Sequence, residues 1–242
     1  MSKTMIENEL RKYLKNLGAS LVEFADLSKI DALSRKNMAY GIAFAIKIKP
    51  SIILGINEGP TKEYYEEYNK INKTLDYIAV SCGKYISDKG YNAIGQTSTY
   101  VTSNDNLTTS LPHKTVATRA GLGWIGKNAL LITPKYGSAI RISSVLTDMP
   151  LITSDPINES KCRQCNKCVE ACPASAIKGM LWNVNVSRDE LLNPLKCREK
   201  ARELLNKKIG IESAICGKCI EICPVTQLYI KNENVLNVYI VV

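Results

Sequence analysis

The chain has 242 residues, 45% of them apolar, which is enough for one large domain or two modest ones with a real core. No apolar run approaches the roughly 18 residues of a membrane-spanning helix, and the start, Met-Ser-Lys-Thr, does not resemble a secretory signal, so we expect a cytoplasmic protein. The formal net charge is +9, spread along the chain without a basic block. A polyanionic or acidic partner is therefore compatible with the charge but not required by it.

The N-terminal part predicts helices and strands in alternation. Residues 4–17 carry apolar side chains at helical spacing, and Gly18 stands where a capping glycine ends a helix. A weaker helical pattern covers 26–37. Residues 41–48 are apolar and β-branched and predict a buried strand, which 52–56 continue or follow with another strand.

The longest predicted helix begins after Thr61, which suits the N-cap position. Glutamates in its first turns favour the positive end of the helix dipole, and apolar residues then repeat every three or four positions. Cys82 lies on that apolar stripe, so we interpret it as a core thiol and not as a metal ligand. Residues 91–95 predict a short strand, and 96–110, rich in Ser, Thr and Asn, predict a polar loop able to cover a site.

Residues 119–127 read Arg-Ala-Gly-Leu-Gly-Trp-Ile-Gly-Lys, with three glycines in six positions. Such a turn must pack closely against a flat group or another backbone. Its letters match the Gly-x-Gly-x-x-Gly fingerprint of dinucleotide-binding loops, but that loop follows a strand and opens a helix. Here the preceding segment is helical and 129–133 is strand-like, so the order is reversed and NAD binding is disfavoured. A further strand is predicted over 139–147, and 152–160 read as a linker after a domain boundary near residue 150.

Eight of the nine cysteines form one pattern near the C-terminus. Its first run has the spacing of bacterial ferredoxins, in which the fourth cysteine, before a proline, ligates the other of two iron-sulfur clusters: Cys162-x-x-Cys165-x-x-Cys168-x-x-x-Cys172-Pro. The second run lacks an early cysteine: Cys216-x-x-Cys219-x-x-x-Cys223-Pro. Cys197 is the obvious substitute. The pattern therefore predicts two 4Fe-4S ligand sets, Cys162, Cys165, Cys168 and Cys223 for cluster 1, and Cys172, Cys197, Cys216 and Cys219 for cluster 2.

Three other interpretations of the cysteines stay open. Zinc binds Cys-x-x-Cys pairs, although a third cysteine two residues on, followed by Cys-Pro, is not zinc-ribbon spacing. Disulfides are a second possibility, but a cytosolic chain keeps its thiols reduced. Isolated buried thiols are the third, and the regular spacing disfavours them.

Three further elements are predicted around the cysteines. Residues 174–178 should form the short helix that follows Cys-Pro in ferredoxins. Pro194 introduces a helix over 197–208, with Gly210 beyond its end. The tail, 234–242, is apolar and β-prone, which predicts pairing with a sheet edge or a second subunit.

The glycine run 119–127, the later Leu146-Thr147-Asp148 and the cysteine pattern, in that order, resemble the epoxyqueuosine reductase family. The resemblance covers roughly residues 110–228 well and the first hundred residues loosely. It implies an iron-sulfur and cobalamin-dependent oxidoreductase, related to the reductive dehalogenases, that reduces an epoxide on a modified tRNA nucleoside. The chain stops soon after the second cysteine run, without the C-terminal helical-repeat extension of many members.

The resemblance also implies an α+β architecture, with an N-terminal α/β corrinoid-binding-like domain over 1–150. A ferredoxin-like domain with two 4Fe-4S clusters over 151–230 and a tail over 231–242 would follow. Electrons would come from a low-potential donor of the flavodoxin or ferredoxin type, and tRNA would carry the substrate. The cofactor-binding residues near the corrinoid would be Arg119, Gly121, Leu122, Gly123, Trp124, Gly126 and Lys127.

The proton donor is where the sequence departs from the family. Its catalytic aspartate precedes the glycine run in an Asp-x-x-Pro setting, whereas residues 106–113 hold no acid. Asp105 or His113, the only histidine, would have to replace it. An imidazole can donate a proton near neutral pH or approach cobalt as a lower ligand, although a lone histidine more often caps a helix.

We therefore expect a reductase that passes electrons through two clusters to a corrinoid and a substrate. One alternative is a ferredoxin-type electron-transfer or activating protein that serves a partner enzyme and has no substrate of its own. Another is a corrinoid-handling protein for which reduction of cobalt is itself the task. A retained corrinoid would favour the reductase or the corrinoid-handling protein over the electron-transfer protein.

Overall fold

The structure is a computed structural model that describes residues 3–97 and 107–240. The chain forms two compact units, each assembled from three separate segments. The first, here the sheet unit, comprises Met1–Ile46, Lys70–Gly123 and Arg141–Asn158. The second, here the cysteine unit, comprises Lys47–Asn69, Trp124–Ile140 and Glu159–Val242. The expected domains were consecutive, with a boundary near residue 150, whereas these units interleave along the chain.

The sheet unit is built on a four-stranded sheet in the order β1-β2-β6-β3. The strands are β1 (Leu21–Asp26), β2 (Tyr40–Lys47), β3 (Ala93–Gly95) and β6 (Ile140–Thr147). β1 runs antiparallel to β2, with Val22 opposite Phe44, and β3 runs antiparallel to β6, with Ile94 opposite Leu146. The predicted strands over 41–48, 91–95 and 139–147 are therefore confirmed.

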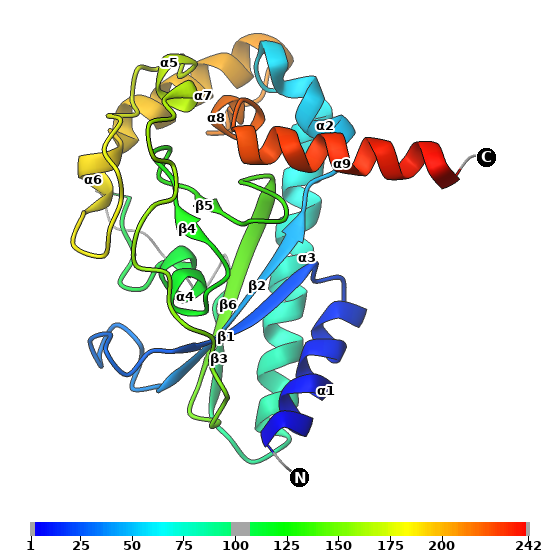
Figure 1. The fold of residues 1–242 in the computed structure, drawn as a ribbon, viewed down its shortest axis with the longest axis vertical. Coiled ribbons are helices and arrows are strands. Elements are labelled where there is room, and N and C mark those ends of the chain that lie inside the picture. The colour runs from blue at the N-terminus through cyan, green and yellow to red at the C-terminus, as the bar shows by residue number, and fades with distance from the viewer. Residues whose placement is uncertain (1–2, 98–106, 241–242) are drawn as a thin grey trace. The chain divides into compact units, whose positions relative to one another are not determined.

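Three helices cover this sheet, α1 (Lys3–Asn16), α3 (Lys62–Ser87) and α4 (His113–Arg119). α1 and α4 both pack against β1, and Figure 1 draws α1 and α3 on one side of the sheet and α4 on the other. Tyr13 of α1 stacks on Tyr85 of α3, with ring centroids 4.9 Å apart. α3 begins as predicted, because Thr61 Oγ1 accepts a hydrogen bond from the Tyr64 backbone N–H at 3.2 Å. Cys82 is buried in the core, as expected.

Two glycines let helices touch the sheet. A Cβ on Gly41 of β2 would lie 2.6 Å from a Val116 methyl of α4. A Cβ on Gly95 of β3 would lie 2.8 Å from the Ala79 carbonyl oxygen of α3. Any larger residue would push the helix away from the sheet, so these positions fix the depth of packing.

The cysteine unit holds mostly short elements. They are α2 (Pro50–Leu54), η1 (Gly55–Glu58), β4 (Trp124–Ile125), β5 (Leu131–Ile132), α5 (Lys167–Glu170), α6 (Arg188–Leu191), α7 (Pro194–Ile209), α8 (Lys218–Glu221) and α9 (Pro224–Ile240). β4 and β5 pair as an antiparallel hairpin. α7 matches its prediction: Pro194 opens it, and Gly210 ends it in the left-handed conformation at φ 71°.

The start of α9 is anchored by contacts with two other segments of this unit, around Ile48 and around Gly137. Gly137 has φ +58°, and a Cβ there would lie 2.4 Å from the Thr226 backbone nitrogen. Tyr229 Oη donates to the Ile48 carbonyl at 3.0 Å, and its ring meets Tyr136 edge-on. The residue directly before this helix is Cys223, so these contacts also fix the position of that thiol.

Four expected elements are wrong. Residues 27–37 form turns and not a helix, because the Asp26 and Asp31 carboxylates accept hydrogen bonds from nearby backbone N–H groups and favour turns. Residues 52–56, expected as a strand, fall in α2 and η1, since Pro50 suits the first position of a helix.

Around the cysteines, 174–178 are not helical, because Ile177 forms a β-bridge with Leu192. The tail was predicted to be a strand, but α9 continues to Ile240. The predicted loop over 96–110 falls largely on 98–106, outside the described residues. No helix in the described ranges is both long and apolar enough to cross a membrane.

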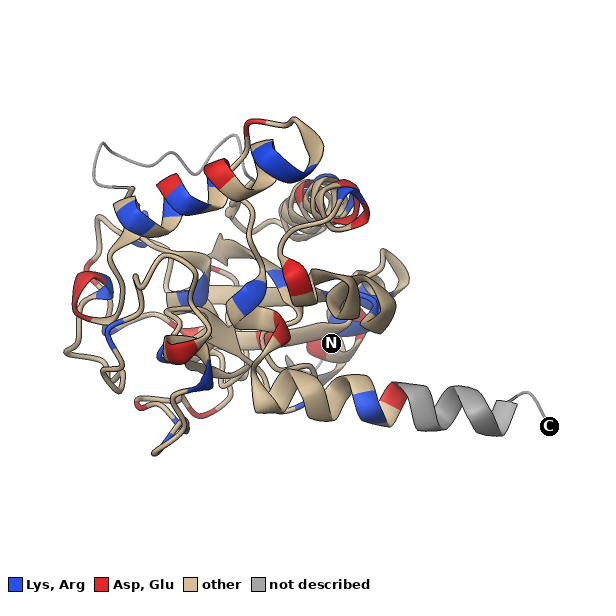
Figure 2. Cartoon of the chain, turned by 90° about the horizontal axis from the view of Figure 1, so that it is seen from above, with Lys and Arg blue, Asp and Glu red and all other residues tan. Residues whose placement is uncertain are grey.

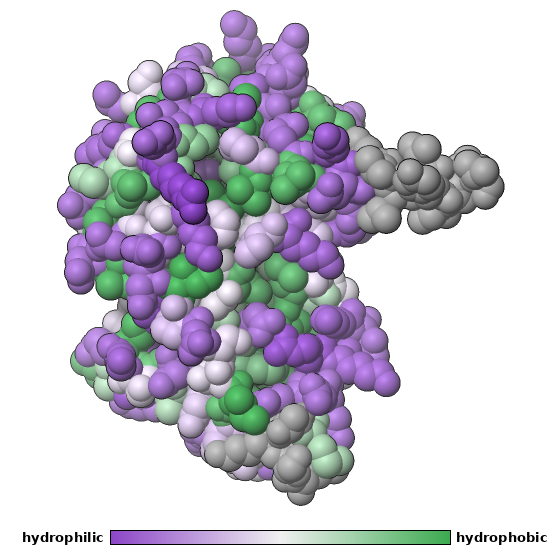
Figure 3. Space-filling view, in the orientation of Figure 1, coloured by the Kyte–Doolittle hydropathy of each residue, from purple (hydrophilic) through white to green (hydrophobic). Residues whose placement is uncertain are grey.

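Charge and apolar side chains are dispersed over the surface. Figure 2 shows Lys and Arg alternating with acidic residues along helices, and on α7 Lys200 pairs with Glu203 at 2.7 Å. On the face in Figure 3, hydrophobic residues are scattered among hydrophilic ones. The dispersed charge agrees with the sequence, where no basic block occurs.

Candidate metal centres

The first predicted ligand set surrounds one cavity of about 190 Å³ in the cysteine unit. Cys162, Cys165, Cys168 and Cys223 all line it, together with Trp124, Lys127, Asn128, Ile132, Lys161, Pro224 and Val225. Three of the thiols come from one short segment: the Cys165 N–H donates to the Cys162 carbonyl at 3.0 Å, and Cys168 lies in α5. The fourth comes from the other end of the unit, next to α9.

The thiols of this set influence one another electrostatically. Burial raises the pKa of Cys168 to about 11, and repulsion from Cys162, Cys223 and Cys165 adds to the effect. The pKa of Cys223 is also raised, first by burial, although backbone N–H groups of Thr226 and Val225 oppose it. The thiolates of Cys168 and Cys223 are therefore costly to form without a positive charge nearby.

The second predicted set is also brought together. Burial and then the neighbouring Cys172 and Cys216 raise the pKa of Cys197, which lies on α7. Burial raises the pKa of Cys219, on α8, well above its usual value, and its thiol neighbours Cys216, Cys197 and Cys172 raise it further. Cys168 of the first set contributes to the same shift, so the two sets are neighbours.

These groups fit iron-sulfur clusters chemically. Iron-sulfur clusters of the 4Fe-4S type are held by four cysteine thiolates, and each set supplies four sulfur donors. Positive iron would stabilise the thiolates that burial and mutual repulsion disfavour. Across the described ranges, His, Cys, Asp and Glu side chains form no group arranged to hold a single metal ion. The first set instead encloses a cavity with thiols on its wall.

Residues of other segments fix the position of α8 through polar and steric contacts. Gly217 adopts φ +83°, and a Cβ there would lie 2.9 Å from the Tyr64 ring. The next residue, Lys218, donates from Nζ to the Asn57 carbonyl at 2.8 Å and to Glu221 at 2.8 Å. α8 also packs against α5, so the helices that carry Cys168 and Cys219 support each other.

The beginning of the glycine run ties down a neighbouring segment of the sheet unit. Arg119 Nη2 donates to the Ile157 carbonyl at 2.9 Å and to Asn158 Oδ1 at 2.7 Å. Gly121 has φ +66°, and a Cβ there would lie 2.6 Å from the Asp155 carbonyl oxygen. The close backbone approach expected of this turn is thus present. Leu122 is buried, and the chain leaves the sheet unit after Gly123.

The end of the glycine run lies at the cysteine cavity. Trp124 and Lys127 line it, and Gly126 is needed because a Cβ would lie 2.4 Å from Ile132 Cδ1. Lys127 Nζ donates to Asn166 Oδ1 at 2.7 Å. Sequence reasoning assigned these residues to a corrinoid and missed Asn166 and Lys161. The available signal was their place in the sequence, since Asn166 lies between two cysteines and Lys161 directly precedes Cys162.

Comparisons with known proteins find a 4Fe-4S domain and a similarity to epoxyqueuosine reductases. Residues 161–226 match the family model described as a 4Fe-4S double cluster binding domain. Over 120 residues the chain is 35% identical to the epoxyqueuosine reductase of Listeria monocytogenes, a match covering 45% of this chain and 28% of that protein. This chain is similar to epoxyqueuosine reductases. The match covers 28% of the Listeria monocytogenes protein and 57% of the epoxyqueuosine reductase of Staphylococcus aureus.

Two solved structures show the fold that this similarity implies. An epoxyqueuosine reductase with an epoxyqueuosine-modified tRNA-Tyr stem loop superposes with a TM-score of 0.60 at 20% identity, covering 93% of this chain and 66% of that one. A reductive dehalogenase, whose structure was described as suggesting a mechanism for B12-dependent dehalogenation, gives 0.62 at 20% identity, covering 89% and 32%. The chain therefore has a mixed α/β fold of the kind that epoxyqueuosine reductases and reductive dehalogenases share.

Of the two candidate proton donors, one is described. His113 opens α4, but its side chain does not cap that helix, since Nδ1 lies 2.9 Å from Ser144 Oγ of β6. Burial and, to a smaller extent, repulsion from Arg141 lower the pKa of His113 to about 4, although Asp76 opposes the shift. The imidazole is therefore neutral near pH 7. Asp105 lies outside the described residues, so the catalytic role of both remains a prediction.

Proposed function

We propose that this chain is an iron-sulfur reductase of the epoxyqueuosine reductase type, with two 4Fe-4S clusters held by the two cysteine sets. One observation carries the proposal: four of the eight patterned thiols line one cavity. The effect of Cys216, Cys197 and Cys172 on the pKa of Cys219 supports a second set beside it. The similarity of residues 161–226 to double-cluster domains supports the same assignment.

We also propose a role for each part of the chain. The cysteine unit would act as the ferredoxin-like part, and residues 1–150 would supply the corrinoid-binding-like domain. The similarity to a B12-dependent reductive dehalogenase supports a corrinoid, and the tRNA stem loop bound by an epoxyqueuosine reductase supports a tRNA substrate. When bound, the clusters supply one-electron transfer and the corrinoid supplies a strongly reducing metal centre. A low-potential donor of the flavodoxin or ferredoxin type would deliver the electrons.

The chain's own residues have distinct tasks in this proposal. The thiols hold the clusters, and the contacts around Gly217 and Lys218 fix the helix that carries Cys219. Because His113 is neutral near pH 7, it would serve as a neutral hydrogen-bond donor from a ring that Ser144 orients, with Asp105 as the other candidate acid.

The first test is the iron and sulfide content of anaerobically purified protein. We expect about eight iron atoms per chain in the wild type and about four in Cys219→Ala, because each 4Fe-4S cluster takes four cysteines. Cys82→Ala is the matched control, since that thiol is buried in the core of the sheet unit and belongs to neither predicted set, and it should keep about eight. About four iron atoms in the wild type, or iron loss in Cys82→Ala, would contradict the assignment.

The second test addresses the cofactor and the substrate. Protein prepared anaerobically with cobalamin should retain a corrinoid, visible in its absorption spectrum, and should act on unfractionated tRNA that carries epoxyqueuosine. Clusters without a corrinoid would instead support an electron-transfer protein for a partner enzyme. A corrinoid without turnover of tRNA would support a corrinoid-handling protein.

A further inference from the structure

One buried polar atom in the structure is without a hydrogen-bond partner, and it belongs to a residue on the wall of the first cysteine cavity. Among buried side-chain nitrogen and oxygen atoms of the described residues, only Trp124 Nε1 lacks a partner. Trp124 is 6% exposed, so water does not replace the missing partner freely. A buried N–H without an acceptor costs about 1–3 kcal/mol, which a protein normally avoids. Its neighbours on that wall are four thiols, and sulfur is an acceptor.

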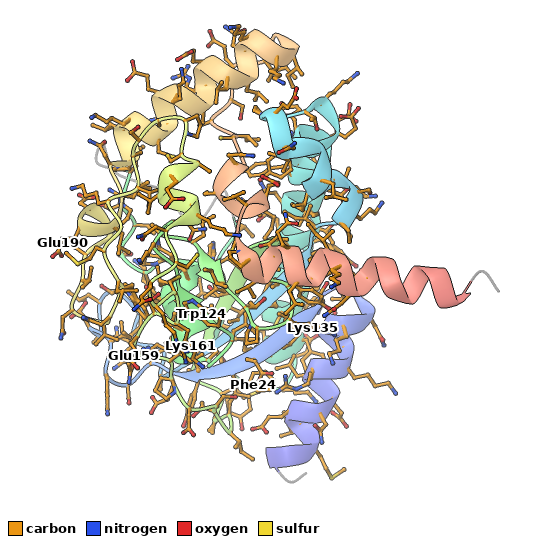
Figure 4. The ribbon with its side chains drawn as sticks, turned by 45° about the horizontal axis from the view of Figure 1, so that its top comes forward. Phe24, Trp124, Lys135, Glu159, Lys161 and Glu190 are labelled. Carbon is orange, nitrogen blue, oxygen red and sulfur yellow. The ribbon has the colours of Figure 1, made fainter. Side chains whose placement is uncertain are left out.

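A buried lysine lines the same cavity. Lys127 is 5% exposed, and its Nζ donates to the neutral amide oxygen of Asn166. No carboxylate of the described residues forms an ion pair with it, which is unusual because burying a lone ammonium is costly. A negatively charged group nearby would offset that cost. Lys161 adds a second positive charge to the wall, with its Nζ 5.7 Å from the Trp124 ring, and Figure 4 labels these two residues close together.

We propose that Trp124 and Lys127 set the reduction potential of the cluster held by Cys162, Cys165, Cys168 and Cys223, Trp124 by donating its indole N–H to a sulfur and Lys127 by its charge. The inference rests on the proposed function, because it requires that cluster. Both residues are positioning residues: they act on the potential and make no contact with substrate.

The direction of the effect follows from charge. Reduction adds one electron, taken from the low-potential one-electron donor, and makes the cluster and its thiolates more negative without forming or breaking a bond. An N–H donor and a buried cation both stabilise the more negative state, so they raise the potential of this cluster. We expect a smaller effect on the second cluster, because both residues line the cavity of the first set.

The test is a redox titration of holoprotein followed by electron paramagnetic resonance, with iron measured in every sample. Trp124→Phe keeps a ring but removes the N–H, and Lys127→Met keeps the volume but removes the charge. In each we expect the ratio of reduced to oxidised first cluster at a fixed potential to fall about tenfold, a shift of about 59 mV for one electron, with a smaller shift at the second cluster. Lys127→Arg restores the charge and should restore most of the potential.

Two controls match these variants. Trp182→Phe removes the other indole N–H of the cysteine unit, and Lys135→Met removes an exposed lysine, and both should leave both potentials unchanged. Unchanged potentials in Trp124→Phe and Lys127→Met with about eight iron atoms retained overturn the inference but not the proposed function. Absence of iron from the wild type overturns the proposed function itself. If Trp124→Phe loses iron, the Lys127→Met and Lys127→Arg pair decides.

Discussion

The two units of this chain are held in shape by different means. The sheet unit has strands of up to 8 residues and a core that includes Phe24, Phe44 and Leu146. In the cysteine unit, α5 and α8 are 4 residues long, and each carries a predicted cluster ligand. Helices this short do not persist on their own, because one turn does not offset the cost of nucleation.

The difference indicates that burial of apolar surface organises one unit and that metal binding completes the other. Hydrophobic burial is sufficient where long amphipathic elements meet a sheet. Where thiols crowd and raise one another's pKa, a bound cation should stabilise the local structure by neutralising their thiolates. Removing metal and removing core volume should therefore damage different halves of the molecule.

The largest expected effect is that of iron removal. When iron is chelated anaerobically, the backbone amides of α5, α7 and α8 should lose their protection from hydrogen exchange, because the thiols are then no longer cross-linked. Amides of β2 and β6 should stay protected. Hydrogen exchange read by mass spectrometry measures both in one sample. Uniform loss of protection across the chain would show that the sheet unit also depends on iron.

The next largest expected effect is that of removing core volume from the sheet unit. Phe44→Ala should destabilise the sheet unit by about 3–5 kcal/mol, since it opens a cavity at a position with no exposed surface. Iron content should remain about eight per chain. Tyr77→Ala is the control: that side chain is 61% exposed on α3, so its loss should change stability by less than about 0.5 kcal/mol. Denaturant unfolding followed by circular dichroism measures the difference.

The sequence predicted some helices and strands correctly and missed others. In α1 and α3 the helical period of apolar residues matched the structure, because each helix buries one face in a core. In β2 the continuous apolar and β-branched run matched, because the strand is buried on both faces. Sequence reasoning failed for 52–56, where an apolar run of five fits a strand or a helix equally well. It also missed β1, a strand of 6 residues directly before the turns that were interpreted as a helix.

Part of the candidate site was also predictable from the sequence, and part was not. Spacing alone predicted which thiols group together, since the ligand pattern is local in sequence except for Cys197 and Cys223. Spacing gave no indication that Lys127 meets Asn166, 39 positions away, or that Trp124 lines the thiol cavity. Such contacts depend on tertiary packing, which one-dimensional patterns do not encode. The interleaving of the two units is hidden from sequence for the same reason.

A third prediction concerns pH and the sheet unit. The folded pKa of His113, about 4, lies below its ordinary value of 6.5, so the unfolded chain takes up a proton first as pH falls. Stability from this group is full above about pH 6.5 and declines as pH drops toward 4, by on the order of 3 kcal/mol. His113→Gln should flatten that part of the pH profile. An NMR titration that places the pKa of His113 between 6 and 7 would contradict the burial of its ring.

The smallest expected effect tests how far metal binding substitutes for local structure. Asn193 Oδ1 caps α7 by accepting from the Lys196 N–H at 3.0 Å, and Asn193→Ala should cost about 1 kcal/mol where the helix depends on its cap. If iron bound at Cys197 holds the first turn, the loss should be visible in the iron-depleted protein and small in the holoprotein. Asn185→Ala, at an exposed position outside any helix, is the control for a lost amide. Equal losses with and without iron would mean that α7 is ordered by its own sequence, and that the dependence on metal is confined to α5 and α8.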